Sequence, residues 1–83
     1  MTTGVIFVYV EPGKERSTYN DLLDIKGIKD IYHVFGEFDF VIISKVEGLS
    51  SLNRIVDTIR EIDTVTATRT IVGAELPMNH NAK

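Results

Sequence analysis

The sequence predicts a single α+β domain with the element order βαββαβ, and three observations lead to this fold class. The chain has 83 residues, enough for one domain and too few for two. Four segments are rich in β-branched and aromatic residues, as strands are. Two further segments space their apolar side chains three or four residues apart, which is typical of helices.

The first half of the chain is predicted to form a strand, a helix and a second strand. Residues 5–10 are apolar throughout and stop at Glu11-Pro12-Gly13, so we expect a strand there. A helix is expected from Lys14 to about Lys26, with Gly27 as its C-terminal cap. Its apolar stripe consists of Tyr19, Leu22, Leu23 and Ile25. The second strand is expected over residues 28–35.

The second half is predicted to form a strand, a longer helix and a last strand. Residues 38–46 form the third strand, joined to the second by a two-residue reversal at Gly36-Glu37. A helix is expected over residues 50–62, with one clean apolar face. That face consists of Leu52, Ile55, Val56, Ile59 and Ile62. The fourth strand covers residues 64–74. Residues 1–76 are then one domain, and residues 77–83 a frayed tail.

This order predicts the ferredoxin-like arrangement, a four-stranded antiparallel sheet with both helices on one face. The other sheet face should then be polar, because it would meet water. Instead, the first and third strands are apolar on both sides; in the third, Phe38, Phe40 and Ile42 alternate with Val41 and Ile43. A patch of this size is unusual on a monomer, so we expect a homodimer joined sheet to sheet.

Composition excludes several classes of function. The net charge of −3 and the scattered basic residues argue against direct binding of nucleic acid. With no cysteine and two isolated histidines, we predict no metal site, no cofactor and no catalytic residues. The start of the chain lacks the basic segment of a signal peptide, and no apolar run approaches the roughly 20 residues of a membrane span. We expect a cytoplasmic protein without membrane contact.

Two groups of residues are candidates for binding a small polar ligand. Gly36 could let backbone N–H groups approach a carboxylate, and Asp39 could hold an ammonium group. Thr66, Thr68 and Thr70 share one face of the last strand and could form a hydroxyl-lined wall. An ordinary turn and the strand preference of threonine explain the same residues, and these readings stay open.

The chain also carries a set of motifs in a characteristic order. Gly36-Glu37-Phe38-Asp39 lies at the central hairpin, and Val65-x-x-Thr68-x-Thr70-x-Val72 on the last strand. With the βαββαβ order, these motifs resemble the effector-binding (RAM) domain of Lrp/AsnC transcription regulators. Ile25-Lys26-Gly27-Ile28 fits the family's Ile-Pro-Gly-Val turn without its proline, whereas Ile62-Asp63-Thr64-Val65 departs from the second such turn.

The resemblance implies an amino-acid sensor. Such domains dimerise through their sheets, assemble into larger oligomers, with an octamer among the candidate sizes, and bind free amino acids between dimers. The positions that match the family's ligand site are Gly36, Glu37, Phe38, Asp39, Thr68 and Thr70. The resemblance gives the hairpin backbone the ligand's carboxylate and Asp39 its ammonium group.

The family usually carries a helix-turn-helix domain, which this sequence does not contain before its first strand. If the chain is complete, we expect a stand-alone sensor without chemistry that modulates transcription by oligomerisation or by co-assembly with a full-length Lrp/AsnC regulator; if it is a fragment, the DNA-binding half belongs to the missing part. Two alternatives remain. A small dimeric α+β-barrel enzyme would need His33 as general base, and an ACT-type amino-acid-binding domain would use a site near Pro12-Gly13.

Overall fold

The computed structural model describes residues 1–74 and contains the six elements in the predicted order. They are β1 (Thr2–Val10), α1 (Glu15–Leu23), β2 (Ile28–His33), β3 (Phe40–Val46), α2 (Leu49–Arg60) and β4 (Val65–Ala74). The predicted tail, residues 77–83, lies outside the described residues. Over residues 1–74, no helix is long and apolar enough to cross a membrane.

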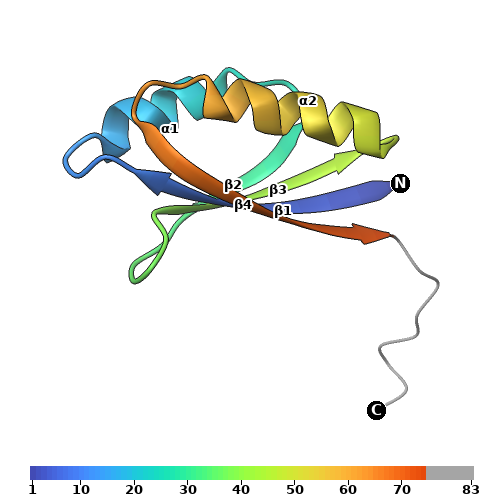
Figure 1. The fold of residues 1–83 in the computed structure, drawn as a ribbon, viewed down its shortest axis with the longest axis horizontal. Coiled ribbons are helices and arrows are strands. Elements are labelled where there is room, and N and C mark those ends of the chain that lie inside the picture. The colour runs from blue at the N-terminus through green and yellow to red at the C-terminus, as the bar shows by residue number, and fades with distance from the viewer. Residues whose placement is uncertain (75–83) are drawn as a thin grey trace, which may run out of the picture.

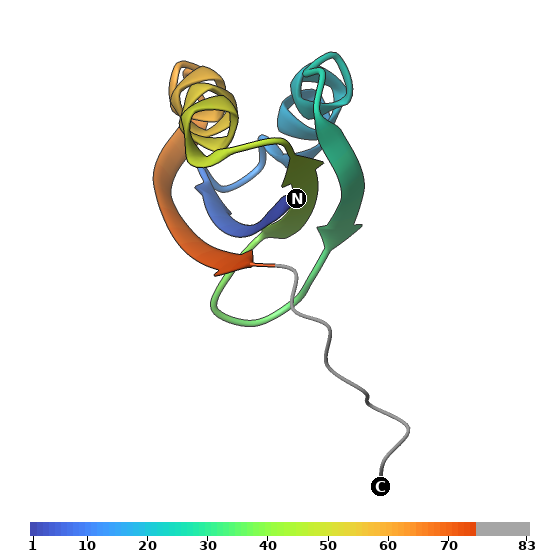
Figure 2. The same ribbon diagram turned by 90° about the vertical axis from the view of Figure 1, so that its right-hand side faces the viewer.

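The four strands form one antiparallel sheet in the order β2-β3-β1-β4. Both helices lie on one face of this sheet, and the opposite face carries no helix (Figure 1, Figure 2). This confirms the α+β, ferredoxin-like fold. In the following we call the face under the helices the covered face and the opposite one the open face.

The core lies between the covered face and the helices. Alternate residues of β1 and β3 enter it, and α2 contributes the predicted apolar face. The buried apolar side chains are Ile6, Val8, Val10, Leu22, Phe40, Ile42, Leu52, Ile55 and Ile59. Helix α2 packs closely on β1 at Gly4, where a side chain would collide with Leu52.

The predicted apolar stripe of α1 is wrong in two positions. Thr18 and Leu22 are buried, whereas Tyr19 and Leu23 are 39% and 55% exposed. A short helix turns only a narrow stripe toward the sheet, and two residues four positions apart fill it. The Thr18 hydroxyl is satisfied there, because it donates to the carbonyl of Lys14 and pairs with the hydroxyl of Thr64.

The predicted role of Gly27 is also wrong. Helix α1 ends at Leu23 with Asp24 as its C-terminal cap, several residues before the glycine. Gly27 instead has a φ of 96° and turns the chain into β2. Its carbonyl accepts a 2.7 Å hydrogen bond from Oγ of the buried Ser44.

The central hairpin is wider than the predicted two-residue reversal. The last paired residues of β2 and β3 are His33 and Phe40, so residues 34–39 connect the two strands. This connection bends toward the open face of the sheet (Figure 1, Figure 2). The ring of Phe38 packs there on Phe7 and Tyr9, at centroid distances of 4.6 Å and 4.9 Å. The strand pattern predicted that Phe38 and Phe40 lie on the same side of the sheet. This prediction is wrong, because Phe38 lies on the open face and Phe40 on the covered face.

The open face is apolar, as the sequence predicted for β1 and β3. The register places the following side chains on it: Val5, Phe7 and Tyr9 of β1, Tyr32 of β2, Val41 and Ile43 of β3, and Ile71 of β4. Most of them are half-buried by their neighbours, but Tyr32 and Ile71 are 54% and 59% exposed.

Candidate functional site

Asp39 is fixed by three hydrogen bonds where the hairpin meets the end of β1. Its carboxylate Oδ2 accepts a 2.7 Å hydrogen bond from the backbone N–H of Val10. Its own N–H donates to the carbonyl of Val8, and its carbonyl accepts from the N–H of Val34, both at 3.0 Å. A carboxylate has about four acceptor positions. The half-buried Asp39 therefore retains acceptor capacity for a ligand while it holds the hairpin in place.

Gly36 and Glu37 form the exposed tip of the hairpin. Gly36 has a φ of 121°, and a Cβ atom there would meet nothing within 4 Å. Glycine is thus required by the backbone conformation and not by a lack of space. Within residues 1–74, the N–H groups of Gly36 and Glu37 donate no hydrogen bond. Both are available to a carboxylate.

Phe38 and β4 border one hollow on the open face, with a volume of about 500 Å³. Its lining residues are Phe7, Phe38, Arg69, Thr70 and Ile71. Arg69 lies opposite Phe7 in the strand register and adds a cation beside the hairpin. No motif or periodicity in the sequence distinguishes Arg69. The strand pattern shows that Arg69 alternates with Thr68 and Thr70, but only the register brings it next to Phe7.

Of the predicted threonine wall, Thr66 and Thr68 border one hollow and Thr70 borders another. Thr68 and Thr70 pair with Val8 and Ile6, whose side chains lie on the covered face. Thr70 borders the hollow next to Phe38, whereas Thr68 borders a different hollow of about 340 Å³ together with Arg60. In one chain, strand β1 separates β4 from the hairpin.

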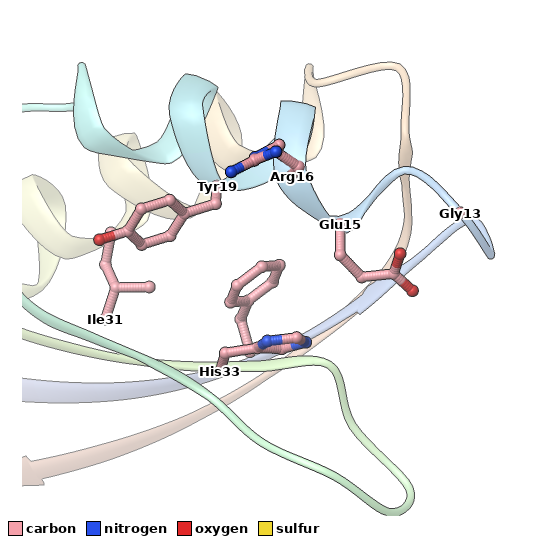
Figure 3. A pocket seen from close by; sticks show the side chains of 7 residues that line it. Gly13, Glu15, Arg16, Tyr19, Ile31 and His33 are labelled. Atoms are coloured by element: carbon pink, nitrogen blue, oxygen red, sulfur yellow. The ribbon is translucent and has the colours of Figure 1, made fainter.

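A further hollow of about 630 Å³ lies between the start of α1 and the end of β2 (Figure 3). Its lining residues are Gly13, Glu15, Arg16, Tyr19, Ile31, His33 and Phe40. The ring centroids of His33 and Phe40 are 5.0 Å apart. Within residues 1–74, His33 and Asp39 form no hydrogen bond with each other, and no group of three or more His, Cys, Asp or Glu could hold a metal ion.

Residues 3–81 match the family described as the Lrp/AsnC ligand binding domain. An uncharacterised HTH-type transcriptional regulator of Pyrococcus furiosus is 28% identical over 74 residues. This match covers 89% of the chain but only 50% of the regulator, so the chain spans about half of that relative's length.

Solved structures of short proteins match the chain over nearly their whole length. The crystal structure of FFRP-DM1 is 29% identical, with a TM-score of 0.81, and covers 89% of this chain and 100% of its own. A hypothetical protein from Pyrococcus horikoshii is 28% identical, with a TM-score of 0.82 and coverage of 96% and 98%.

A longer regulator shares the fold. The feast or famine regulatory protein of M. tuberculosis, complexed with L-methionine, has a TM-score of 0.77 at 18% identity. It matches 100% of this chain with 56% of its own length.

Proposed function

The chain belongs to the family of Lrp/AsnC ligand-binding domains, and on this premise we propose that it senses a free amino acid and acts on transcription through its assembly with other subunits. The observation that carries the proposal is the hairpin tip. The free N–H groups of Gly36 and Glu37 lie on the same short connection as the carboxylate of Asp39. Donors and an acceptor so close together suit the two charged ends of an amino acid.

In the proposed complex, the N–H groups of Gly36 and Glu37 bind the ligand's carboxylate and Asp39 binds its ammonium group. Phe38 contacts the ligand from the neighbouring hollow. Thr70 borders that hollow through its backbone, because its side chain lies on the covered face, like that of its partner Ile6. Arg69, in the same hollow, provides a positive charge for the carboxylate. Thr68 belongs to the site only if a neighbouring subunit brings it there, because it borders another hollow of its own chain. The L-methionine in the M. tuberculosis relative supports an amino acid as the ligand class.

The open face provides the dimer interface in this proposal. Its apolar side chains are neighbours across β1 and β3, with Arg69 beside Phe7, and covering them gives about 25 cal/mol per Å² before the costs of association. The hairpin contacts these side chains through Phe38, so the ligand site lies at the edge of the interface. Ligand binding and assembly would therefore influence each other.

The proposed output is a change in oligomer size or co-assembly with a full-length Lrp/AsnC regulator in the cytoplasm. The regulator from P. furiosus is about twice as long as the matched segment. A mixed oligomer would place DNA binding in the partner, which agrees with the acidic net charge of this chain. The role requires no catalysis.

The test is a thermal unfolding screen against the common amino acids, with light scattering on the same samples. One amino acid should stabilise the protein by about 2.7 kcal/mol when its concentration is a hundred times Kd, and should shift the oligomer size. Asp39→Asn should abolish this response, because the amide keeps an acceptor for Val10 N–H but loses its charge. Asp57→Asn, at an exposed position of α2, is the matched control.

If no amino acid changes the melting temperature or the oligomer size, the sensing role is wrong. If Asp39→Asn responds as strongly as Asp57→Asn, a ligand binds but the hairpin assignment is wrong.

A further inference from the structure

We propose that the hollow between α1 and β2 is a second ligand site, for a small molecule that combines an aromatic ring with a carboxylate. The site is distinct from the hairpin tip, because its residues come from the turn before α1, from α1, from β2 and from the first residue of β3, and not from Gly36 or Glu37. Its volume of about 630 Å³ lies in the usual range of small-molecule sites.

The floor and walls of this hollow are aromatic and apolar. Phe40 is 1% exposed and forms a fixed floor. His33 lies against it at a centroid distance of 5.0 Å, and Tyr19 at 6.1 Å with an interplanar angle of 19°. Ile31 completes the wall. Flat aromatic groups pack well on such surfaces, in stacked or edge-to-face contacts.

The hollow exists because α1 packs only part of its inner side on the sheet. The helix buries Thr18 and Leu22, and Tyr19 remains 39% exposed beside them. Leu22 fills the space under the second half of the helix, whereas no large apolar side chain of residues 15–18 fills the space under the first half. A ligand ring would occupy this unfilled part.

Two side chains of opposite charge lie beside the hollow and would set the orientation of a bound ligand. Figure 3 shows Arg16 reaching over the side of Tyr19, whereas the carboxylate of Glu15 lies near Gly13. Among residues 1–74, neither Arg16 nor Glu15 has a side-chain partner in an ion pair or hydrogen bond. A ligand carboxylate would therefore bind at the Arg16 end and would avoid Glu15.

The test is a titration of the full, isotopically labelled chain followed by amide NMR shifts, with phenylacetate as the probe. Phenylacetate should give saturable shifts at the lining residues, with the millimolar affinity usual for so small a ligand. 2-Phenylethanol has the ring without the charge, and acetate the charge without the ring. Each should bind at least about tenfold more weakly, because each loses one of the two kinds of contact.

Three variants at exposed or half-buried helix positions separate the contributions. Arg16→Gln should weaken phenylacetate binding by about tenfold or more, since a charge-assisted contact is lost. Arg54→Gln on α2 is the matched control and should change nothing. Glu15→Gln should strengthen binding, because a like charge beside the site is removed.

Shifts at the lining residues distinguish this site from the hairpin tip, because none of residues 34–39 lines the hollow. The proposal is overturned if phenylacetate gives no saturable shift at the lining residues. It is also overturned if acetate binds as well as phenylacetate, or if Arg16→Gln and Arg54→Gln bind it equally. Well-dispersed spectra of each variant show that the fold is retained.

Discussion

The backbone N–H of Val10 donates a 2.7 Å hydrogen bond to the carboxylate of Asp39, a residue 29 positions further along the chain. The bond ties the hairpin connection to the end of the central strand β1. Asp39 is therefore a structural anchor as well as a candidate ligand residue, and these two roles respond differently to substitution.

Asp39→Ala should destabilise the protein by about 1.5–3 kcal/mol, because a hydrogen bond to a charged acceptor is lost and the half-buried N–H of Val10 is left without a partner. Asp39→Asn should cost less than half of this, since its amide oxygen still accepts the bond. Urea unfolding measures both values. Equal costs for the two variants would show that the charge, and not the acceptor, stabilises the hairpin.

The second prediction concerns the two phenylalanines of the hairpin. Phe38 packs on Phe7 and Tyr9, whereas Phe35 is 93% exposed. Phe38→Ala should therefore lower the free energy of unfolding by about 2 kcal/mol, through lost apolar burial and ring contacts. Phe35→Ala is the control and should stay within about 0.5 kcal/mol. A similar cost for both would contradict the packing of Phe38 on the open face.

The element order and the sheet were predictable from strand-type composition and turn residues, and the inner face of α2 from its periodicity. Leu52, Ile55 and Ile59 are buried because their spacing matches the turn of a helix. In α1 the same spacing rule predicted a buried Tyr19 and missed the buried Thr18. The Thr18 hydroxyl can be buried because it forms hydrogen bonds with the Lys14 carbonyl and the Thr64 hydroxyl. Such pairing between distant residues leaves no periodic signal.

The hairpin shows a second limit of sequence reasoning. In the sequence, Phe38 continues the alternation of inward and outward side chains of β3. In the structure, Phe38 packs on Phe7 and Tyr9, and β3 begins only at Phe40. The candidate residues Gly36 and Asp39 could be located by residue type, whereas Arg69 required the register of β4 against β1. Contacts between strands therefore determine on which face Phe38 lies and which residues Arg69 meets, and the local sequence pattern does not show either.

The third prediction compares two threonines with the same local hydrogen bond. Thr18 and Thr58 each donate to the carbonyl four residues earlier, at 2.8 Å and 2.9 Å. Thr18 is buried and also pairs with Thr64, whereas Thr58 is exposed. Thr18→Val should cost about 1–3 kcal/mol, because it leaves buried polar groups unpaired.

Thr58→Val should stay within about 0.5 kcal/mol in the same unfolding experiment, since water replaces its bond. If the two variants cost the same, the pairing of Thr18 with Thr64 contributes nothing to stability.

The last prediction tests the open face as the dimer interface. Ile71 lies on this face opposite Val5 and is 59% exposed. Ile71→Glu would place a charge in the apolar contact between two subunits, where it has no partner, and should shift the protein from dimer to folded monomer at micromolar concentration. Sedimentation measures the mass, and circular dichroism shows that the fold is intact.

Leu49→Glu is the matched control, because Leu49 is 53% exposed and begins α2 on the opposite side of the molecule. It should leave the dimer unchanged, since that side is not expected to meet a second subunit. Should Leu49→Glu dissociate the dimer while Ile71→Glu does not, the subunits meet through their helices. In that case the apolar side chains of the open face require another explanation.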